Sequence, residues 1–507
     1  MLLSHALFKN DAWRPTSHLQ WPLLCTMRFF LFLFIMSYVF ASNDVFAQDV
    51  PPIKTTNVPH FKLAPAPEIP EELSSSSFFF ENRERLREIL PDSSMVVLFS
   101  APIRKRTNDI DYPFHQDPDF FYFTGVNEDN AMLVMFKTPM RINEKWYREI
   151  LFIENDNMIK QVWNGPVLGS DQAKDVSGVA SVLSNTEFKP MEFNWNEIDK
   201  VYSNKNLFIE LDDVKHPGDI ASMVNHFKLK TERAGKSILV NEGEDLYAQL
   251  RQHKSSKELE MMQRAIDITG DAHVNVMKMV EPGMTEYQLQ AILEYTFHYN
   301  GSRVAFPSIV ASGDNGAIMH YTENDDILIP GDLVILDIGA QYEGYAADIT
   351  RTIPVSGVFS EEQKQVYQVV LDAQTVAIRY ATKGYKFWTP HEEAYRTIGK
   401  GLISLGIITE WGDIGKYFMH GTSHYLGLDV HDAGVYSSLQ PGEVITVEPG
   451  IYIPKGSPCD EKWWGIFVRI EDDILITDGP AKVLSGRSPR KISEIEALMS
   501  NESALTE

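Results

Sequence analysis

The feature that most constrains this chain is a pair of apolar runs, each carrying one aspartate and separated by a short polar turn. The segment 333–352 reads LVILDIGAQYEGYAADITRT, which is typical of two antiparallel strands joined by a hairpin. With the turn centred between Tyr342 and Glu343, Asp337 and Asp348 lie directly opposite each other on one face. Two carboxylates that close repel each other unless a cation or a shared proton lies between them. The hairpin therefore predicts an acidic site, although either aspartate alone could equally end a strand and cap a turn.

A second motif concentrates histidine. The segment 419–432 reads MHGTSHYLGLDVHD and holds His420, His424 and His431, three of the 14 histidines of the chain. Imidazole ligates metals and titrates near neutral pH. The glycines at 421 and 427 indicate that another group approaches the backbone closely there. A single histidine in such a segment would more often be structural, but the clustering favours a functional role.

Two further motifs place a charged side chain at the end of an apolar run. Glu448 follows the run VITV and precedes a Pro-Gly break, and Arg469 and Glu471 share one face of the segment FVRIEDD because side chains alternate along a strand. A turn residue is the alternative interpretation of Glu448. A surface ion pair, which contributes little stability, is the alternative for the other two.

Five of these side chains form a plausible ligand set for two metal ions: Asp337, Asp348, His424, Glu448 and Glu471. Four carboxylates balance the charge of two divalent cations. An oxygen-rich set with one imidazole favours Mn²⁺, Co²⁺ or Mg²⁺ over a structural zinc ion, which prefers Cys and His. We expect two divalent ions, with Mn²⁺ as the first choice and Co²⁺ or Zn²⁺ as alternatives. Paired ions generate a nucleophile at neutral pH and polarise a carbonyl group.

The N-terminus has the pattern of a targeting segment. Arg28 precedes the apolar run FFLFLFIM at 29–36, and Val45-Phe46-Ala47 resembles a small-residue cleavage site. This order is typical of a secretory signal, and the run is short for a membrane span. We expect residues 1–47 to be a signal peptide cleaved near Ala47, and the chain to be exported to a periplasm or secreted. An uncleaved N-terminal anchor is the alternative, and only then would the chain contact a membrane.

Hydrophobic patterns divide the remainder. Residues 48–77 are rich in proline and serine and predict an extended leader. Alternating strand and helix patterns predict an N-terminal α/β domain over 78–245, connected near 226–250 to an α+β catalytic domain over 246–500. Helices of the second domain are expected at about 256–280, 285–299, 360–381 and 389–405.

Charge and cysteine content exclude several classes of protein. The chain has 46 Lys+Arg against 70 Asp+Glu, a formal net charge of −24, which disfavours binding to nucleic acid. Its two cysteines, Cys25 and Cys459, exclude a disulfide framework and a cysteine-based zinc site.

The motifs together resemble the pita-bread metallopeptidases, and within them the aminopeptidase P family. The resemblance covers about residues 78–500, and the stretches that carry it are HYTEN (320–324), LDIGAQYEGYAADITRT (336–352), HGTSHYLGLDVHD (420–432), TVEPGIYI (446–453), RIEDD (469–473) and, in the N-terminal region, YPFHQDPDFFYFTGV (112–126). It implies an N-terminal α/β domain of the creatinase/aminopeptidase P type and a pita-bread catalytic domain. His115 stands where the family pattern has Arg.

The resemblance also implies roles for the metal ligands. Asp348 and Glu471 would bridge the two metals, with Asp337 mainly on one of them. His424 and Glu448 would serve one metal. No departure from the family pattern occurs at these five positions.

Further roles follow from the same resemblance. His320 and His431 would hold the peptide carbonyl and the developing oxyanion, and His420 and Arg469 would support them. Glu448 would relay a proton to the leaving proline nitrogen. Proline has no backbone N–H, so an apolar slot for its ring is expected, and the aromatic residues near the motifs could supply it: Tyr321, Tyr425 and Tyr452.

The implied activity is release of the first residue from peptides with proline in second position. A prolidase, which cleaves only Xaa-Pro dipeptides, is the nearest alternative. A methionine aminopeptidase, a metal-free hydrolase of the creatinase type and a non-catalytic scaffold are less favoured, the last two because all five ligands are present. Family members commonly form dimers or tetramers, so a homodimer or homotetramer is expected.

Overall fold

The computed structural model describes residues 75–154, 158–208 and 218–500. The expected signal peptide and nearly all of the expected leader therefore lie outside the described residues. Within the described part of the chain, no helix has both the length and the apolar character that crossing a membrane requires.

The N-terminal domain is built on a six-stranded mixed sheet in the order β6-β5-β4-β1-β7-β8. The strands are β1 (Ser94–Phe99), β4 (Met132–Ile142), β5 (Lys145–Ile153), β6 (Val182–Ser184), β7 (Lys200–Ser203) and β8 (Ile238–Leu239). A two-stranded hairpin, β2 (Lys105–Thr107) and β3 (Ile110–Asp111), stands apart from this sheet. The helices are α2 (Ser76–Ile89), α3 (Pro118–Thr124), α4 (Met158–Asn164), α5 (Ser170–Ser177), α6 (Ile220–Arg233) and α7 (Val240–Arg251).

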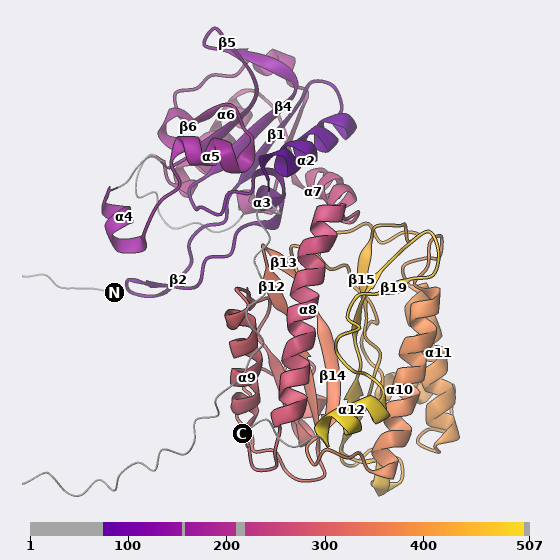
Figure 1. Cartoon of the computed structure of the whole chain (residues 1–507). Helices are drawn as coiled ribbons and strands as arrows, with labels where there is room; N and C mark the ends of the chain where they lie inside the picture. The colour runs from indigo at the N-terminus through magenta and orange to yellow at the C-terminus, as the bar shows by residue number, and fades with distance from the viewer. Residues whose placement is uncertain (1–74, 155–157, 209–217, 501–507) are drawn as a thin grey trace, which may run out of the picture. The chain divides into compact units, whose positions relative to one another are not determined.

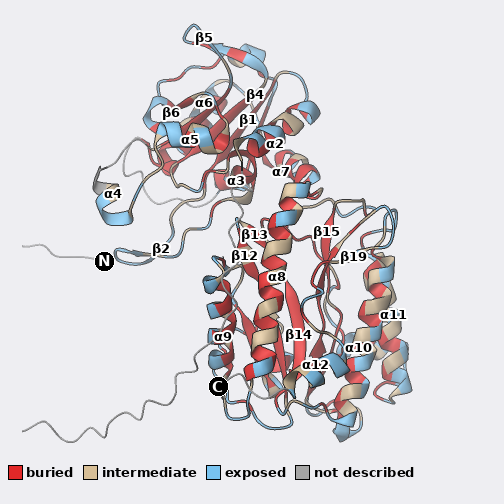
Figure 2. Ribbon diagram, viewed as in Figure 1, coloured by how far each residue is buried: buried red, intermediate tan, exposed pale blue. Residues whose placement is uncertain are grey.

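The central strand β1 is an uninterrupted apolar run because both of its faces are buried. Met95 and Val97 belong to one buried cluster and Val96 and Leu98 to another, so both faces of the strand are covered. Figure 2 shows the central strands in the colour of buried residues, with exposed residues on the surrounding helices. The expected α/β pattern is confirmed.

The segment 226–250 is more ordered than a simple connection. It consists of the end of α6, the strand β8 and most of α7, and β8 pairs in parallel with β7 of the N-terminal sheet. Helix α7 continues without a break through the expected boundary at 245/246.

The catalytic domain has antiparallel pairing throughout its described strands. Its strands are β9 (Arg303–Val304), β10 (Ile309–Ser312), β11 (Leu333–Ile338), β12 (Ala340–Tyr342), β13 (Tyr345–Ala346), β14 (Ile349–Pro354), β15 (Val444–Val447), β16 (Gly450–Ile453), β17 (Ile466–Arg469), β18 (Asp472–Leu475) and β19 (Lys482–Val483). Its helices are α8 (Ser256–Met279), α9 (Glu286–Tyr299), α10 (Glu361–Tyr380), α11 (Thr389–Ser404) and α12 (Ile492–Met499).

Four of these helices were expected from the sequence and are confirmed to within one or two residues at each end. Ser255 caps α8 in a capping box with Glu258, and Ser360 caps α10 in a capping box with Gln363. Helix α8 lies against β12, β13 and β14, as Figure 1 shows. These strands belong to two small sheets, β13-β12-β9 and β10-β11-β14, so α8 packs against both of them.

The central hairpin has a different register from the expected one. Tyr342 pairs with Tyr345, so the turn is centred between Glu343 and Gly344, and Asp337 lies opposite Thr350. The expected pairing of Asp337 with Asp348 is therefore wrong. The reason is local: Glu343 and Gly344 both have positive φ, 49° and 87°, as a two-residue type I′ turn requires, and Gly344 accommodates this conformation best.

The shift keeps both aspartates on one face because it amounts to two residues. By this register Asp348 falls diagonally from Asp337, opposite Gly339. A Cβ atom on Gly339 would lie 1.9 Å from the carbonyl oxygen of Ala347, so only glycine fits beside the strand break that precedes β14. The break frees the backbone N–H of Asp348, which donates to Asp473 Oδ2 at 3.2 Å.

Candidate metal centre

All nine side chains that the sequence assigned to metal binding or catalysis line one cavity of about 250 Å³. These residues are His320, Asp337, Asp348, His420, His424, His431, Glu448, Arg469 and Glu471. Met319, Gly421 and Ser423 line it as well, and sequence analysis did not single out Met319 or Ser423. Their positions beside His320 and His424 were the only signal that could have found them.

The carboxylates reach this cavity from the ends of different strands. Asp337 is in β11, Glu448 directly follows β15, and Glu471 lies between β17 and β18. The loop that carries His424 runs beside β15, because the N–H of Thr446 donates to the His424 carbonyl at 2.9 Å. The N–H of Glu471 donates to the Thr350 carbonyl at 3.1 Å, which brings the chain after β17 to β14.

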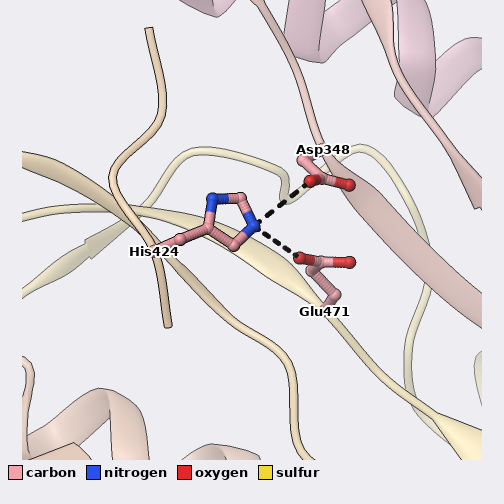
Figure 3. Close-up of side chains that lie close together, drawn as sticks. All are labelled: Asp348, His424 and Glu471. Carbon is pink, nitrogen blue, oxygen red and sulfur yellow. Dashed lines mark ion pairs between the residues drawn. The ribbon is translucent and has the colours of Figure 1, made fainter. Parts of the chain in front are cut away.

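His424, Asp348 and Glu471 point toward one another (Figure 3). His424 Nε2 lies 3.4 Å from Asp348 Oδ2, 4.0 Å from Glu471 Oε1 and 3.6 Å from Glu448 Oε1. The other ring nitrogen, Nδ1, lies 3.0 Å from the Tyr425 carbonyl and is placed to donate to it. This contact leaves the lone pair of Nε2 directed at the carboxylates, which is the arrangement of a metal-binding histidine.

The carboxylates of the site are strongly perturbed in the metal-free chain. Burial, and then repulsion from neighbouring carboxylates, raises the pKa of Asp348 and of Glu471 well above the ordinary value. Burial raises the pKa of Glu448 to about 7, with a further contribution from Asp348. Carboxylates with raised pKa values keep their protons at neutral pH unless bound cations displace those protons.

Asp337 has an oxygen that could bind a cation. Its Oδ2 accepts from Arg469 Nη2 at 2.6 Å, whereas its Oδ1 is buried with no hydrogen-bond donor among the described residues. A buried carboxylate oxygen without a donor is costly, and a divalent cation would satisfy it. The donor set of four carboxylates and one imidazole suits Mn²⁺ and similar ions.

Arg469 is buried and connects three parts of the site. Besides Asp337, it donates to the Tyr452 hydroxyl at 3.0 Å and to Thr350 Oγ1 at 3.3 Å. Thr350 Oγ1 in turn donates to Glu471 Oε2 at 2.7 Å. Arg469 is 4% exposed and Glu471 2%, so the alternative of a surface ion pair is wrong. Arg469 therefore orients the candidate ligands, Asp337 directly and Glu471 through Thr350.

The three other histidines differ in their surroundings. His420 Nε2 lies 2.9 Å from the Tyr452 hydroxyl, and burial together with Arg469 lowers the pKa of His420 to about 4. The His431 ring lies 4.1 Å from the His424 ring, centre to centre, and burial and His424 lower its pKa to about 4. His320 and His431 both remain exposed, so their rings are open to a ligand in the cavity.

The expected aromatic slot for proline is wrong. Tyr321, Tyr425 and Tyr452 are buried, and none of them lines the cavity. Tyr425 packs against Phe387 because it follows His424 in an extended segment and points the other way. Met319 is the one apolar side chain in the cavity lining.

The two glycines of the histidine motif behave differently. A Cβ atom on Gly427 would lie 2.2 Å from Asp432 Oδ2, so the expected close approach occurs there. Nothing lies within 4 Å of such an atom on Gly421.

His115 Nε2 lies 3.8 Å from Asp429 Oδ1, so a histidine faces the catalytic domain where the family pattern has Arg.

Comparisons with known proteins agree with this geometry. The model of metallopeptidase family M24 matches residues 260–478, and the model of the aminopeptidase P N-terminal domain matches residues 79–199. The chain is similar to Xaa-Pro aminopeptidase of Escherichia coli (strain K12), with 36% identity over 442 residues, covering 83% of this chain and 97% of that protein.

Solved structures show the same likeness. Aminopeptidase P from E. coli with the inhibitor Pro-Leu has a TM-score of 0.74 and 35% identity, covering 84% of this chain and 98% of that one. Pseudomonas aeruginosa aminopeptidase PepP has a TM-score of 0.75 and 32% identity, covering 85% and 99%. The expected fold class, an aminopeptidase P-type N-terminal domain followed by a pita-bread catalytic domain, is confirmed.

Proposed function

Because this chain belongs to metallopeptidase family M24 and is an aminopeptidase of the aminopeptidase P type, we propose that it releases the first residue from peptides with proline in second position. The observation that carries the proposal is the single cavity that holds His424 and the four candidate carboxylate ligands and leaves His320 and His431 open. The relative with 36% identity is named an Xaa-Pro aminopeptidase, which supports the choice of substrate.

We propose two divalent ions as the cofactor, Mn²⁺ first and Co²⁺ or Zn²⁺ as alternatives. The residues that would hold them are Asp337, Asp348, His424, Glu448 and Glu471. When bound, such ions would polarise the scissile carbonyl and lower the pKa of water. A solved relative is described as zinc-substituted E. coli aminopeptidase P with product, which supports the tolerance for more than one metal.

The chain's own residues supply the remaining steps. His320 and His431 can each donate a ring N–H to the substrate carbonyl, and a donor aimed at the developing negative charge stabilises the transition state. Glu448 faces the same cavity and can carry a proton to the leaving nitrogen. Breaking the C–N bond turns the prolyl nitrogen into a secondary amine, which needs one proton, and Glu448 can pass on the proton that the attacking water loses. Arg469 holds Asp337 in place through the 2.6 Å contact.

The decisive experiment compares peptides and metals. The chain is chelated, dialysed and assayed on an Xaa-Pro-Xaa tripeptide, the matching Xaa-Pro dipeptide and a tripeptide with alanine in second position. We expect no turnover without metal, recovery of tripeptide cleavage with Mn²⁺, and at least about 100-fold slower cleavage of the other two substrates. Faster cleavage of the dipeptide would identify a prolidase instead. A chain that stays inactive with every divalent metal would be a non-catalytic scaffold.

We also propose that the chain is exported after removal of residues 1–47 and that it forms a homodimer or homotetramer. The order of residues around Arg28 and Ala47 supports the first proposal. N-terminal sequencing of the chain purified from cells tests it, and a mature start at Gln48 is the expected result. Light scattering of the mature chain measures the oligomeric state.

A further inference from the structure

We propose that Glu286, a buried carboxylate outside the cavity, is the positioning residue for His320. This inference rests on the proposed function, in which His320 contacts the peptide carbonyl. Glu286 is the first residue of α9 and is 0% exposed. Neither the ligand set nor the resemblance assigns it a role.

Five donors converge on this one carboxylate. Glu286 Oε1 accepts from the N–H of Ser312 and from Ser312 Oγ, both at 2.7 Å, and from Asn315 Nδ2 at 3.1 Å. Oε2 accepts from the Tyr321 hydroxyl at 2.8 Å and from the N–H of Asp326 at 3.0 Å. The donors come from the beginning, the middle and the end of the segment 312–326. The Glu286 side chain therefore holds both ends and the middle of this loop together.

The pattern of donors suits a carboxylate that only accepts hydrogen bonds. All of the partners donate, and a carboxylate offers about four acceptor positions only when it carries no proton. No cation lies within ion-pair distance of Glu286 in the described part of the chain. The charge is instead stabilised by the hydrogen bonds and by the N-terminus of α9. A buried charge of this kind is tolerated only when its donors hold one geometry.

His320 depends on this loop for its place. Its side chain makes no hydrogen bond among the described residues, and it is exposed at the cavity. Tyr321, the next residue, carries one of the five donors. Asn324 adds a second anchor, since its amide donates to the Ser308 carbonyl at 2.8 Å and to Gln290 Oε1 at 3.0 Å. Therefore α9 and β10 fix the backbone on either side of His320, and this backbone directs the imidazole into the cavity.

The candidate metal ligands lie on other segments. None of them contacts Glu286, so a substitution at Glu286 separates the position of His320 from the metal-binding set. Glu286→Gln keeps the shape of the side chain but replaces one oxygen with an NH₂ group. That group would face the N–H of Ser312 or of Asp326, neither of which can accept a hydrogen bond.

Two readouts test the inference on the full metal-loaded chain. The first is hydrogen exchange of the segment 312–326, which needs no activity, and we expect faster exchange in Glu286→Gln. The second is a double-mutant cycle in kcat/KM with His320→Ala on the tripeptide. We expect Glu286→Gln to lower kcat/KM by about 10²-fold in the parent, as a small misplacement of a catalytic group does, and by less than about two-fold in the His320→Ala background.

Glu258→Gln is the matched control, because Glu258 is another buried carboxylate at a helix N-terminus and contacts Tyr345 rather than this loop. We expect it to leave exchange of 312–326 unchanged. Unchanged exchange in Glu286→Gln, or an equal loss of kcat/KM with and without the His320 imidazole, would overturn the inference. A parent chain inactive on all peptides would refute the proposed function and the catalytic consequence, whereas the exchange readout would still decide whether Glu286 holds the loop.

Discussion

We expect Asp348→Asn to abolish peptidase activity and, in the same protein, to stabilise the metal-free fold at alkaline pH. Activity falls because Asp348 is one of the three groups gathered at His424 Nε2, and we expect a loss of more than about 10³-fold, since removing a single oxyanion donor already costs about 10²–10³-fold. Metal content should fall in parallel, because a divalent ion loses one of its few anionic ligands.

The stability effect follows from the sign of the pKa shift. Burial and then Asp337 raise the pKa of Asp348 in the metal-free chain. A group whose folded-state pKa is raised contributes stability below its unfolded-state pKa and loses that contribution as the pH rises through the folded-state value. Ionised Asp348 therefore destabilises the metal-free fold at high pH, and asparagine removes that charge.

Thermal unfolding of chelated protein at about pH 5 and about pH 8 measures the effect. We expect a higher Tm for the variant than for the parent at both values, with a larger difference at the higher pH, because pH 5 already lies above the ordinary pKa of an aspartate and the loss grows up to the folded-state pKa. The matched control is Asp413→Asn, which removes a carboxylate paired with Lys416 on the surface and should change neither metal content nor kcat/KM. A variant that keeps its metal and its turnover would refute the dinuclear site.

The second large effect is expected from Asp432→Ala, which should destabilise the chain by about 3–5 kcal/mol. Asp432 accepts from Arg251 through one oxygen and from Lys254 through the other, the latter at 2.9 Å. Arg251 is also bound to Asp119 of the N-terminal domain at 2.7 Å. All four side chains are buried, so removing Asp432 leaves two cations without their shared partner.

The pH dependence of this network has the opposite sign. Although burial raises the pKa of Asp432, Arg251 and Lys254 bring it below its ordinary value. A lowered folded-state pKa stabilises above the unfolded-state pKa, and the contribution is lost as the pH falls through the folded-state value. The difference between parent and variant should therefore be full at neutral pH and disappear in acid.

Urea denaturation of metal-free protein gives the free energy of unfolding for this comparison. The control is Asp429→Ala, because Asp429 lies 3.7 Å from the same Arg251 but its side chain is 44% exposed, and such a pair is worth less than about 1 kcal/mol. A loss from Asp432→Ala no larger than that of the control would show that the buried network contributes little. We also expect kcat/KM to fall, because Asp432 directly follows His431.

Local patterns were sufficient for the helices and for the membership of the site. The capping residues Ser255 and Ser360 mark helix starts because the cap bonds involve residues only three apart. Each of the short motifs around His424, Glu448 and Glu471 contains a candidate ligand, and all three ligands line the cavity. Short-range chemistry of this kind can be read from a sequence.

Contacts between distant segments could not be predicted in the same way. Arg251 meets a carboxylate 181 positions later in the chain, and Glu286 meets donors up to 40 positions later. Tyr321 and Tyr452 look like candidates for an apolar slot in the sequence, yet their hydroxyl groups are used by Glu286 and Arg469. Which partner a buried polar group finds depends on which segments pack together.

The sequence alone therefore identified the charged and histidine side chains that gather in the cavity, because the residue types and their strand and helix periods are local properties. The tertiary structure showed that Asp337 and Asp348 are offset, because the local turn at Glu343 and Gly344 is centred one residue later than the sequence analysis placed it. It also decided what holds the site in place, since the side chains that aim His320, Asp337 and the segment before His431 come from elements far away in the sequence, and only packing brings them within hydrogen-bonding distance.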